Sequence, residues 1–439
     1  MVGTTISHYR ITERPGEGGS FGVVLHREVP TLFDSRPRLA SSANHRHLCI
    51  AWMAGLLALL LGACGSGSSG DFDATAFGAV ADGATDSTQA IQSAIDEASA
   101  AGGRVLVPSA EAPYLISKTL LIRASGVEIV GEGATIRFAD DAADEGDPTV
   151  ILASGSEDNP IRDVAIRGLT VDANFYAQEG AERPRGIEFR FVSGARVTDV
   201  TIRRPFVGLD FGRGCVDAEA RDVVITDFAE DGFDASGDAN EFSGAKTTDI
   251  RFIDVVARDA PRADGNAFEI EDGVENVLVE NATVENVAGN GFGLRNHFVE
   301  GKEDHSRNVE LRNVTVSGTG GQFAIYGRCA PREAFPNNSY YEMKLTNVET
   351  DGAVAFIGPI EDLEITGGSF AAIYLGFEGP DDVPAKQNAV ATAKLQNLQA
   401  EQLRINGMDG TITLSNLTLP KGQKSVSIEG SGADVQTDW

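Results

Sequence analysis

The chain has 439 residues, of which 42% are hydrophobic and 50 are glycines. This composition excludes a disordered chain, because so much apolar surface needs a core, and it excludes a helical bundle, because glycine destabilises helices. The formal net charge of −29 excludes nucleic acid and an anionic membrane surface as binding partners, since both require clustered Lys and Arg side chains.

The first 52 residues contain a fragment of a known pattern. Residues 6–24, ISHYRITERPGEGGSFGVV, resemble the opening of a bacterial serine/threonine protein kinase, where such a run leads into a glycine-rich loop over ATP. Phosphoryl transfer also needs a strand-borne lysine, an HRD-type catalytic loop and a DFG element in that order, and these do not follow. We therefore interpret residues 1–52 as a non-functional or wrongly assigned N-terminal extension.

Residues 53–70, MAGLLALLLGACGSGSSG, form a short apolar stretch followed by a Gly/Ser run. The apolar part is too short to span a bilayer. It resembles a bacterial lipoprotein signal that ends at Cys64, with the Gly/Ser run as a flexible tether. This resemblance implies that translation starts near Met53, that Cys64 is lipidated, and that the protein is anchored by lipid to the outer membrane at the bacterial cell envelope.

Residues 71–439 are predicted to form one domain that starts with a helix. Asp86 followed by Gln89 gives a capping-box pattern, and Gly102 marks the end of the helix. One apolar stripe contains Ile91, Ala94, Ile95 and Ala98. The run from residue 71 to 108 resembles the N-terminal cap of the pectate-lyase-like superfamily, which includes rhamnogalacturonase-like, polygalacturonase-like and epimerase-like enzymes. The resemblance implies a solenoid whose open end the helix covers.

A drifting repeat fills the chain from about residue 126 to the C-terminus, and its clearest copy is VENVLVENATVENVAGNGFGLRN, which starts at Val274. Apolar and polar residues alternate, and Asn or Gly stands where the alternation breaks, which is typical of short strands joined by tight turns. The first core position of each copy is expected at Val164, Val200, Val223, Ile250, Val277, Val309, Met343, Leu363 and Ile412. Units this small must stack to bury their apolar sides. The sequence therefore predicts an all-β fold, a right-handed single-stranded parallel β-helix.

One strand of each coil has the form Gly-aromatic-x-apolar. Inward Phe residues at one position of successive coils, Phe233, Phe268, Phe292 and Phe323, are expected to stack as a core ladder. The residues between the inward ones must face out. They give one column of Glu188, Asp210, Asp234, Glu269, Gly293 and Ala324, and a second of Arg190, Gly212, Ser236, Glu271, Arg295 and Tyr326.

Three acids, Asp210, Asp234 and Glu269, are thus expected about 4.8 Å apart on successive coils. Carboxylates that close together require a shared proton or a bound cation, so the column is a candidate catalytic site and a candidate Ca²⁺ site. Long insertions beside this strand are expected to form the walls of a groove, and in the superfamily that the chain resembles a polysaccharide lies in such a groove. Substrate contacts are predicted for Glu188, Arg190, Glu271, Arg295 and His297.

The reaction stays open at this point. Hydrolysis would use two of the three acids as acid and base, whereas elimination or epimerisation would need a base such as Tyr326, His297 or His305. The paired-Asp, Gly-His-Gly and Arg-x-Lys motifs of polygalacturonases are absent, and so is the Asp-Pro-His motif of alginate epimerases. We expect a surface-anchored, monomeric enzyme that acts on a glycan containing uronic acid. The alternative is a non-catalytic, glycan-binding or structural β-helix.

Overall fold

The computed structural model describes residues 5–6, 9–13, 23–27, 70–140, 148–178, 183–237, 246–296, 304–329, 338–358, 360–377, 379, 389–407, 410–420, 426–429 and 434–438. The chain divides into two units, residues 1–65 and 66–439. In the first unit, three antiparallel strands, β1 (Thr5–Ile6), β2 (Tyr9–Glu13) and β3 (Val23–Arg27), pair in the order β1-β2-β3. The predicted lipoprotein signal and Cys64 lie outside the described residues. Within the described ranges, no helix is both long and apolar enough to cross a membrane.

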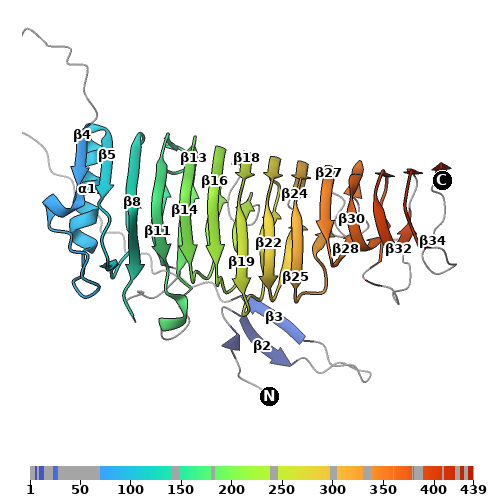
Figure 1. Ribbon diagram of the computed structural model, residues 1–439, viewed down its shortest axis with the longest axis horizontal. Coiled ribbons are helices and arrows are strands. Elements are labelled where there is room, and N and C mark those ends of the chain that lie inside the picture. The colour runs from blue at the N-terminus through green and yellow to red at the C-terminus, as the bar shows by residue number, and fades with distance from the viewer. Residues whose placement is uncertain are drawn as a thin grey trace, which may run out of the picture. The chain divides into compact units, whose positions relative to one another are not determined.

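The second unit is a right-handed parallel β-helix, as the repeat predicted, and its strands stack side by side (Figure 1). Its coils build three walls. Wall 1 contains β7 (Leu120–Ile122), β9 (Thr149–Ser154), β12 (Arg185–Arg190), β15 (Leu209–Gly212), β17 (Phe233–Ser236), β20 (Asn266–Glu271), β23 (Asn290–Arg295), β26 (Ile325–Arg328), β28 (Ala353–Ile357), the end of β30 (Leu363–Leu375), β32 (Gln399–Asn406) and β34 (Val426–Glu429).

Walls 2 and 3 are formed by shorter strands and by long strands that bend from one wall into the other. They contain β4 (Gly70–Asp73), β5 (Gly103–Val107), β6 (Tyr114–Ile116), β8 (Val127–Phe138), β11 (Ala165–Asp172), β14 (Arg196–Arg203), β16 (Val216–Thr226), β18 (Thr248–Ile253), β19 (Val256–Ala260), β21 (Glu275–Glu280), β22 (Thr283–Val287), β24 (Asp304–Arg312), β25 (Thr315–Thr319), β27 (Asn338–Thr350), β31 (Ala393–Gln396), β33 (Thr411–Ser415) and β35 (Asp434–Asp438). The short strands β10 (Ile161–Arg162), β13 (Val192–Ser193) and β29 (Ile360–Glu361) lie at corners.

A short 3₁₀ helix, η1 (Ala74–Phe77), and the helix α1 (Thr88–Ala101) precede the first coils. The predicted stripe of Ile91, Ala94, Ile95 and Ala98 is fully buried, and α1 ends at Gly102, whose φ is 70°. The predicted capping box is wrong. The helix N-cap is Ser87, whose hydroxyl accepts a hydrogen bond from the Val80 amide at 3.0 Å, while the Asp86 carboxylate accepts one from the Thr88 amide at 2.9 Å.

The predicted core ladder exists in three coils. The rings of Phe233 and Phe268 stack with centroids 4.6 Å apart, and those of Phe268 and Phe292 with centroids 4.5 Å apart. The prediction for Phe323 is wrong, because Ile325 occupies the inward position opposite Phe292. Phe323 lies on the outside of wall 1, where its ring stacks on Tyr326 at 5.2 Å.

All nine predicted core positions of the repeat are buried. Their predicted register is correct from Ile250 to Leu363, and Ile412 shares it through Ala393, a copy that the prediction skipped. The register is wrong at two places, because Ile250 pairs with Ala218 instead of Val223, and Leu169 instead of Val164 lies in line with Val200. The slip has a simple cause, because each coil contains two short apolar stretches with the same alternation, and either can be matched to the next copy.

Asparagine and aspartate residues form a ladder at one corner, as expected for the points where the alternation breaks. Asn281, Asn313 and Asn347 each donate a side-chain hydrogen bond to the residue one coil earlier, at 2.9, 3.2 and 3.2 Å, and Asp254 accepts the first. All four have φ between 52° and 55°, the left-handed region in which Asn and Asp are tolerated. The ladder therefore holds successive turns in register.

The two cysteines among the described residues belong to the core. Cys215 and Cys329 are buried and form no disulfide. Burial raises the pKa of both thiols, so neither is a reactive nucleophile at neutral pH.

Candidate active site

Alternate residues of the wall 1 strands face the core, which gives two columns of outward positions, and a third column lies at or just before the start of these strands. The acid column contains Glu188, Asp210, Asp234, Glu269, Gly293 and Tyr326. The second column contains Arg190, Gly212, Ser236, Glu271, Arg295 and Arg328. The third column contains the residue three positions before each member of the acid column, and we name it the amide column. Its members are Arg185, Val207, Asp231, Asn266, Asn290 and Phe323.

The predicted stack of three acids is present. Asp210 pairs with Asp234, and Asp234 pairs with Glu269, on three adjacent strands of wall 1. Their exposed fractions are only 5, 8 and 2%, so they are much less open to solvent than the sequence led us to expect. The Asp210 carboxylate folds back over Gly212, where a Cβ atom would lie 2.9 Å from Oδ1.

The structure corrects the predicted position of Tyr326. Tyr326 pairs with Gly293 and therefore belongs to the acid column, not beside Arg295, which pairs with Arg328. Ala324, predicted to face outward, is fully buried in the hydrophobic core. The phenol is thus in line with the three acids, two coils beyond Glu269.

Arginines pair with the acids at both ends of the stack. Arg185 donates from Nη1 to Asp210 Oδ2 at 2.8 Å. Arg190 and Thr149 both donate to Glu188, the latter at 3.1 Å. In the middle of the stack, Oδ1 of Asp210 and Oδ1 of Asp234 are buried and have no hydrogen-bond partner among the described residues. Two such oxygens on adjacent coils are costly unless they hold a proton or contact a ligand.

Glu269 is held from two sides. Asn266 of the amide column donates to its Oε2, and Arg295 donates from Nε to its Oε1. Gly293 provides the space for this arrangement, because a Cβ atom there would collide with the Glu269 carboxylate and the Asn266 amide. Asn290 in turn donates to Asn266 Oδ1 at 3.0 Å and accepts from the Phe323 amide at 3.2 Å. The amide column therefore fixes the orientation of Glu269.

Burial changes the protonation of these acids. It raises the pKa of Asp210 to about 7, with Glu188 as a second cause and Arg185 opposing the shift. It raises the pKa of Asp234 well above the ordinary value, helped by Asp210. The pKa of Glu269 is likewise raised by burial and by Glu271, against the effect of Arg295. These raised pKa values favour protonated carboxyl groups in the column near neutral pH, and a protonated carboxyl group is what a general acid requires.

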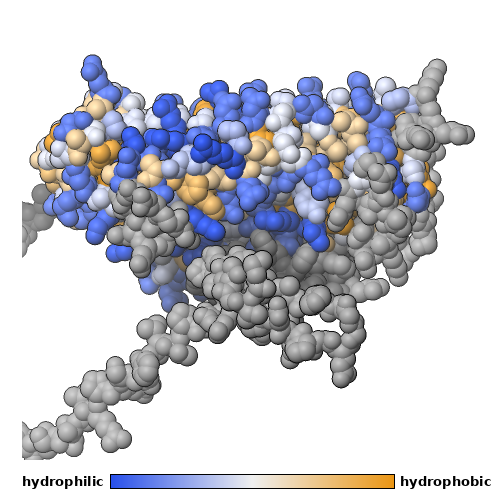
Figure 2. All heavy atoms as spheres, turned by 90° about the horizontal axis from the view of Figure 1, so that it is seen from below, coloured by the Kyte–Doolittle hydropathy of each residue, from blue (hydrophilic) through white to orange (hydrophobic). Residues whose placement is uncertain are grey.

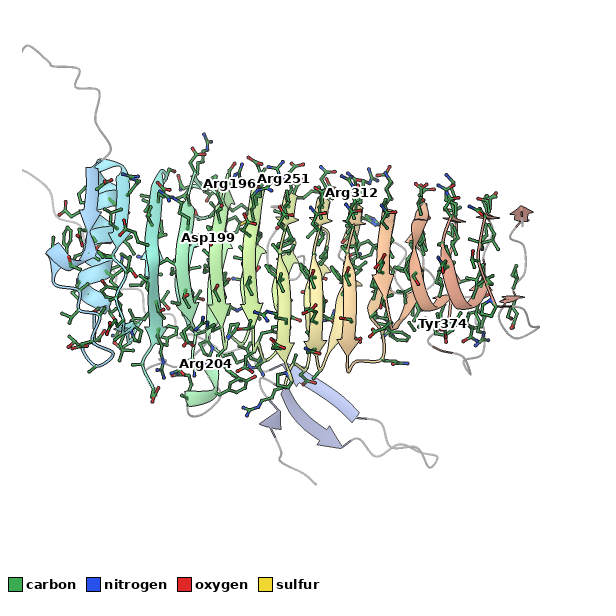
Figure 3. All side chains as sticks on the ribbon, viewed as in Figure 1. Arg196, Asp199, Arg204, Arg251, Arg312 and Tyr374 are labelled. Atoms are coloured by element: carbon green, nitrogen blue, oxygen red, sulfur yellow. The ribbon has the colours of Figure 1, made fainter. Side chains whose placement is uncertain are left out.

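The like charges of wall 1 contrast with the charge pattern on β14, β16 and β18. There, Arg196 and Arg251 flank Glu219 and Asp217 on neighbouring strands, with Arg251 Nε 3.0 Å from Glu219 Oε2 and Arg196 Nη2 2.8 Å from Asp217 Oδ2. Arg196, Arg251 and Arg312 follow one edge of the coils (Figure 3). Alternating charges stabilise neighbouring strands, whereas a column of acids does not. The acid column is therefore better explained by function than by stability.

The residues of the column do not form a ready metal site. Among the described residues, no group of three or more His, Cys, Asp or Glu side chains is arranged to hold a metal ion. Arg185 and Arg295 also neutralise Asp210 and Glu269, which a cation would otherwise do. A shared proton fits this arrangement better than Ca²⁺, and the predicted cation stays untested.

Asp234→Asn is expected to raise the melting temperature at pH 8 and to leave it unchanged near pH 4. Between its ordinary pKa and its raised folded-state pKa, folded Asp234 keeps a proton that the unfolded chain releases. Stability therefore falls as pH rises through this window, and the amide removes that loss. Thermal melts of both proteins from pH 4 to 8 measure the difference. A constant difference across this range would contradict the raised pKa.

Only one of the two predicted histidines lies among the described residues. His297 lies outside the described residues. His305 lies near the start of β24, where it pairs with Ser339 of β27. Both remain candidates only on sequence grounds.

Sequence reasoning missed Arg185, Asp231 and Asn266. The Asp231 carboxylate accepts a hydrogen bond from the backbone N–H of Asn266 at 2.8 Å. Burial raises the pKa of Asp231 to about 7, and the negative charges of Glu230 and Glu271 add to this shift. The signal was visible as a polar residue two positions before each inward Phe, in Asp231-Gly-Phe, Asn266-Ala-Phe and Asn290-Gly-Phe. Strict alternation would place these positions on the same side as the Phe residues, so alternation alone could not assign them to the outward face.

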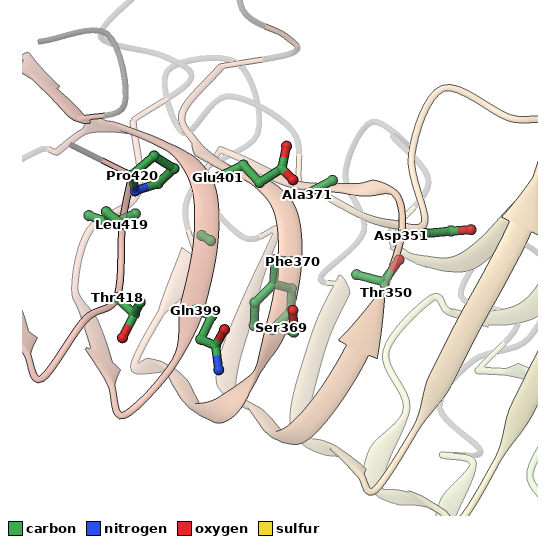
Figure 4. A pocket seen from close by; sticks show the side chains of 11 residues that line it. Thr350, Asp351, Ser369, Phe370, Ala371, Gln399, Glu401, Thr418, Leu419 and Pro420 are labelled. Carbon is green, nitrogen blue, oxygen red and sulfur yellow. The ribbon is translucent and has the colours of Figure 1, made fainter. Parts of the chain in front are cut away.

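A separate hollow of about 520 Å³ lies near the C-terminal coils (Figure 4). Its lining includes Ser369 and Gln399 near Phe370, and Glu401 and Asp351 lie apart from them. Hydrophilic side chains extend along the face shown in Figure 2, with hydrophobic ones in small patches between them. The hollow contains no stacked acids, so we place the candidate chemistry on wall 1.

Comparison with known proteins agrees with the fold. The family described as rhamnogalacturonase A/epimerase, pectate lyase-like matches residues 72–328. Alginate lyase 7 of Azotobacter vinelandii is 34% identical over 180 residues, which cover 37% of this chain, and the match spans only 20% of that relative's length.

Two solved structures share the architecture. The A-module of the mannuronan C-5 epimerase AlgE4 of Azotobacter vinelandii has a TM-score of 0.59 at 16% identity, over 83% of this chain and 99% of that one. PfbA, a surface adhesin of Streptococcus pneumoniae, has a TM-score of 0.53 at 13% identity, over 84% of this chain and 91% of that one. At such low identity, the likeness concerns the fold alone.

Proposed function

The chain belongs to the pectate lyase-like family of rhamnogalacturonase A and epimerases, and from this premise we propose that it acts on a polysaccharide containing uronic acid. The observation that supports this proposal is the pair Asp210 and Asp234, two buried acids on adjacent coils, each with an oxygen that lacks a hydrogen-bond partner among the described residues. Arg190 and Arg295 lie on the strands on either side of the three-acid stack, and each donates through Nε to an acid of the column, so their remaining guanidinium N–H groups can bind a sugar carboxylate.

The reaction that this pair supports best is hydrolysis. One carboxyl group, held neutral by burial, would protonate the glycosidic oxygen as that bond breaks, while its ionised neighbour forms an ester bond to the anomeric carbon. Water would then hydrolyse this ester with the first carboxylate acting as base, which restores both groups. Carboxyl groups on adjacent coils, about 4.8 Å apart, are close to the separation of about 5–5.5 Å that is typical of retaining enzymes. The products would then keep the anomeric configuration of the substrate.

A second candidate reaction, elimination or epimerisation, is favoured by the position of Tyr326. The phenol shares the acid column, so an ionised Tyr326 could remove the proton next to the uronate carboxylate while Arg295 neutralises that group. The alternative of a non-catalytic glycan-binding β-helix is favoured by a different observation, the near-complete burial of the acids.

Product analysis separates these functions. The protein is incubated with polygalacturonate, alginate and a neutral glucan, and both new reducing ends and the ultraviolet absorbance of unsaturated ends are followed. We expect reducing ends without this absorbance on at least one uronate polymer. Absorbance in step with reducing ends would indicate a lyase, and a changed sugar composition without new ends an epimerase. If none of these changes occurs on any polymer, the proposal of an enzyme is wrong.

We also propose that the protein is a lipid-anchored monomer at the cell envelope, on the basis of the sequence around Cys64. Cys64→Ala, expressed from Met53 in a Gram-negative host, is expected to move the protein from the membrane fraction to the soluble fraction, because the variant has no thiol to acylate. Fractionation followed by immunoblotting measures the shift. Unchanged membrane retention would refute the anchor, and Cys215→Ala, a buried core cysteine, serves as the control.

A further inference from the structure

A cluster of rings and guanidinium groups lies beside the first coils of the acid column. Its members, here the arginine–aromatic cluster, are Phe175, Tyr176, Arg183, Phe206 and Arg262. Phe175 contacts Tyr176 with ring centroids 5.1 Å apart and Phe206 at 5.6 Å. The Arg183 guanidinium lies 4.8 Å from the Phe206 ring centre, and that of Arg262 lies 4.4 Å from the Tyr176 ring centre. Three half-buried rings thus form one cluster, tilted against one another by 66° and 50°, with a guanidinium group over each outer ring.

The two cations are available to a ligand. Arg183 and Arg262 are exposed, and no described carboxylate lies within ion-pair distance of either guanidinium. Asp227 and Glu230 act on them only at longer range. Their neighbours Arg185 and Arg204, by contrast, are bonded to Asp210 and Asp172. These two guanidinium groups lie over rings and have no bonded carboxylate among the described residues. In a chain of net charge −29, such cations are suited to an anionic ligand.

The rings are held in place before any ligand arrives. Phe175 and Tyr176 belong to η2 (Phe175–Ala177), which begins after the fully buried Asn174. Asn174 donates to the Phe138 carbonyl at 3.1 Å and to Asp140 Oδ1 at 2.9 Å, and its own amide donates to Asp172 at 3.0 Å. Arg204, at the opposite edge of the coils from Arg196 (Figure 3), donates from Nε to Asp172 at 3.1 Å. A surface fixed in this way loses little entropy on binding.

The cluster adjoins the acid column through the chain itself. Arg183 lies two residues before Arg185, whose guanidinium group donates a hydrogen bond to Asp210. The Phe206 amide donates to the Pro184 carbonyl at 2.7 Å, and the Glu230 amide donates to the Phe206 carbonyl at 2.9 Å. Phe206 is therefore stacked between the coil that carries Arg185 and the coil that carries Asp234. A glycan lying over the acids can reach this surface with its neighbouring sugar units.

We propose that the arginine–aromatic cluster is a binding subsite for carboxylate-bearing sugar units, apart from the acids that carry out the chemistry. The rings support the apolar face of a sugar, and Arg183 and Arg262 bind its carboxylates. This inference rests on the proposed uronate substrate, but it concerns binding alone. It assigns the recognition of negative charge to residues that make no contact with the acid pair.

The test measures binding of polygalacturonate and alginate, with dextran as the neutral probe, by affinity electrophoresis and calorimetry. Arg262→Gln and Arg183→Gln are each expected to weaken binding of a uronate polymer at least tenfold, and Phe206→Ala to weaken it as well. Arg262→Lys keeps the charge but loses the planar fork, so it should restore only part of the affinity. The control is Arg162→Gln, which removes an exposed charge from β10, outside the cluster. Melting temperatures confirm that each variant is folded.

The outcomes separate this inference from the proposed function. If Arg262→Gln binds uronate polymers as tightly as the wild type, or if the wild type binds dextran equally well or binds no uronate polymer, the subsite is refuted. If the wild type binds through Arg183 and Arg262 but forms no product, the subsite stands and the proposed enzymatic function fails.

Discussion

Asp234→Asn is expected to lower the rate of product formation on a uronate polymer by about 10²–10⁴-fold, the usual contribution of a general acid or base. Asp234 is the central member of the acid stack, paired with Asp210 on one side and Glu269 on the other. An amide has nearly the same shape but can neither give nor take a proton in this role. Initial rates at saturating polymer measure the effect, and calorimetric binding shows whether the polymer is still held.

The matched control for this variant is Asp222→Asn. Asp222 is an exposed residue with a φ of 53°, a conformation that Asn adopts as readily as Asp. The control makes the same chemical change away from wall 1 and should keep full activity. An active Asp234→Asn protein would remove the acid column from the mechanism.

The second large effect is on stability. Phe268→Ala is expected to reduce the free energy of unfolding by about 3–5 kcal/mol, the usual loss for a buried Phe. Its ring is fully buried between Phe233 and Phe292, with stacked contacts on both sides, so truncation leaves a cavity in the ladder. Denaturant unfolding followed by fluorescence or circular dichroism measures the change.

The control is Phe77→Ala, because Phe77 is 36% exposed and its loss should change stability by no more than about 0.5 kcal/mol. A loss below about 1 kcal/mol for Phe268→Ala would mean that the inward register of wall 1 is wrong. The acids, one residue away, would then face the core, because a shift of one residue exchanges the two faces of a strand.

Sequence periodicity was sufficient for the fold and for the acid stack. Alternation places Phe233 and Phe268 inward, so Asp234 and Glu269 had to face outward on adjacent coils, and this follows from geometry alone. The same rule failed at Phe323, because it treats every aromatic residue in a strand as part of the core. Phe323 instead joins Tyr326, Tyr374 and Phe377 in a second hydrophobic cluster outside wall 1.

The burial of the acids could not be predicted from the sequence. It depends on which side chains of neighbouring coils lie over them, such as Arg185 beside Asp210, a residue 25 positions earlier in the chain. No local pattern links these two positions. The same is true of the arginine–aromatic cluster, whose members come from three different coils and meet only when the coils stack.

The central claim is that Asp210 and Asp234 share a proton near neutral pH. The most direct test is isotope-edited infrared spectroscopy of protein labelled with ¹³C at the aspartate carboxyl groups, titrated from pH 4 to 9, with Asp210→Asn and Asp234→Asn used to assign the bands. We predict a protonated carboxyl band that persists at pH 6 and weakens in Asp234→Asn, with the remaining intensity coming from Asp210 and Asp231, whose pKa values burial also raises to about 7. If every aspartate band titrates near pH 4 in the wild type, the two acids hold no shared proton and the account of the site is wrong.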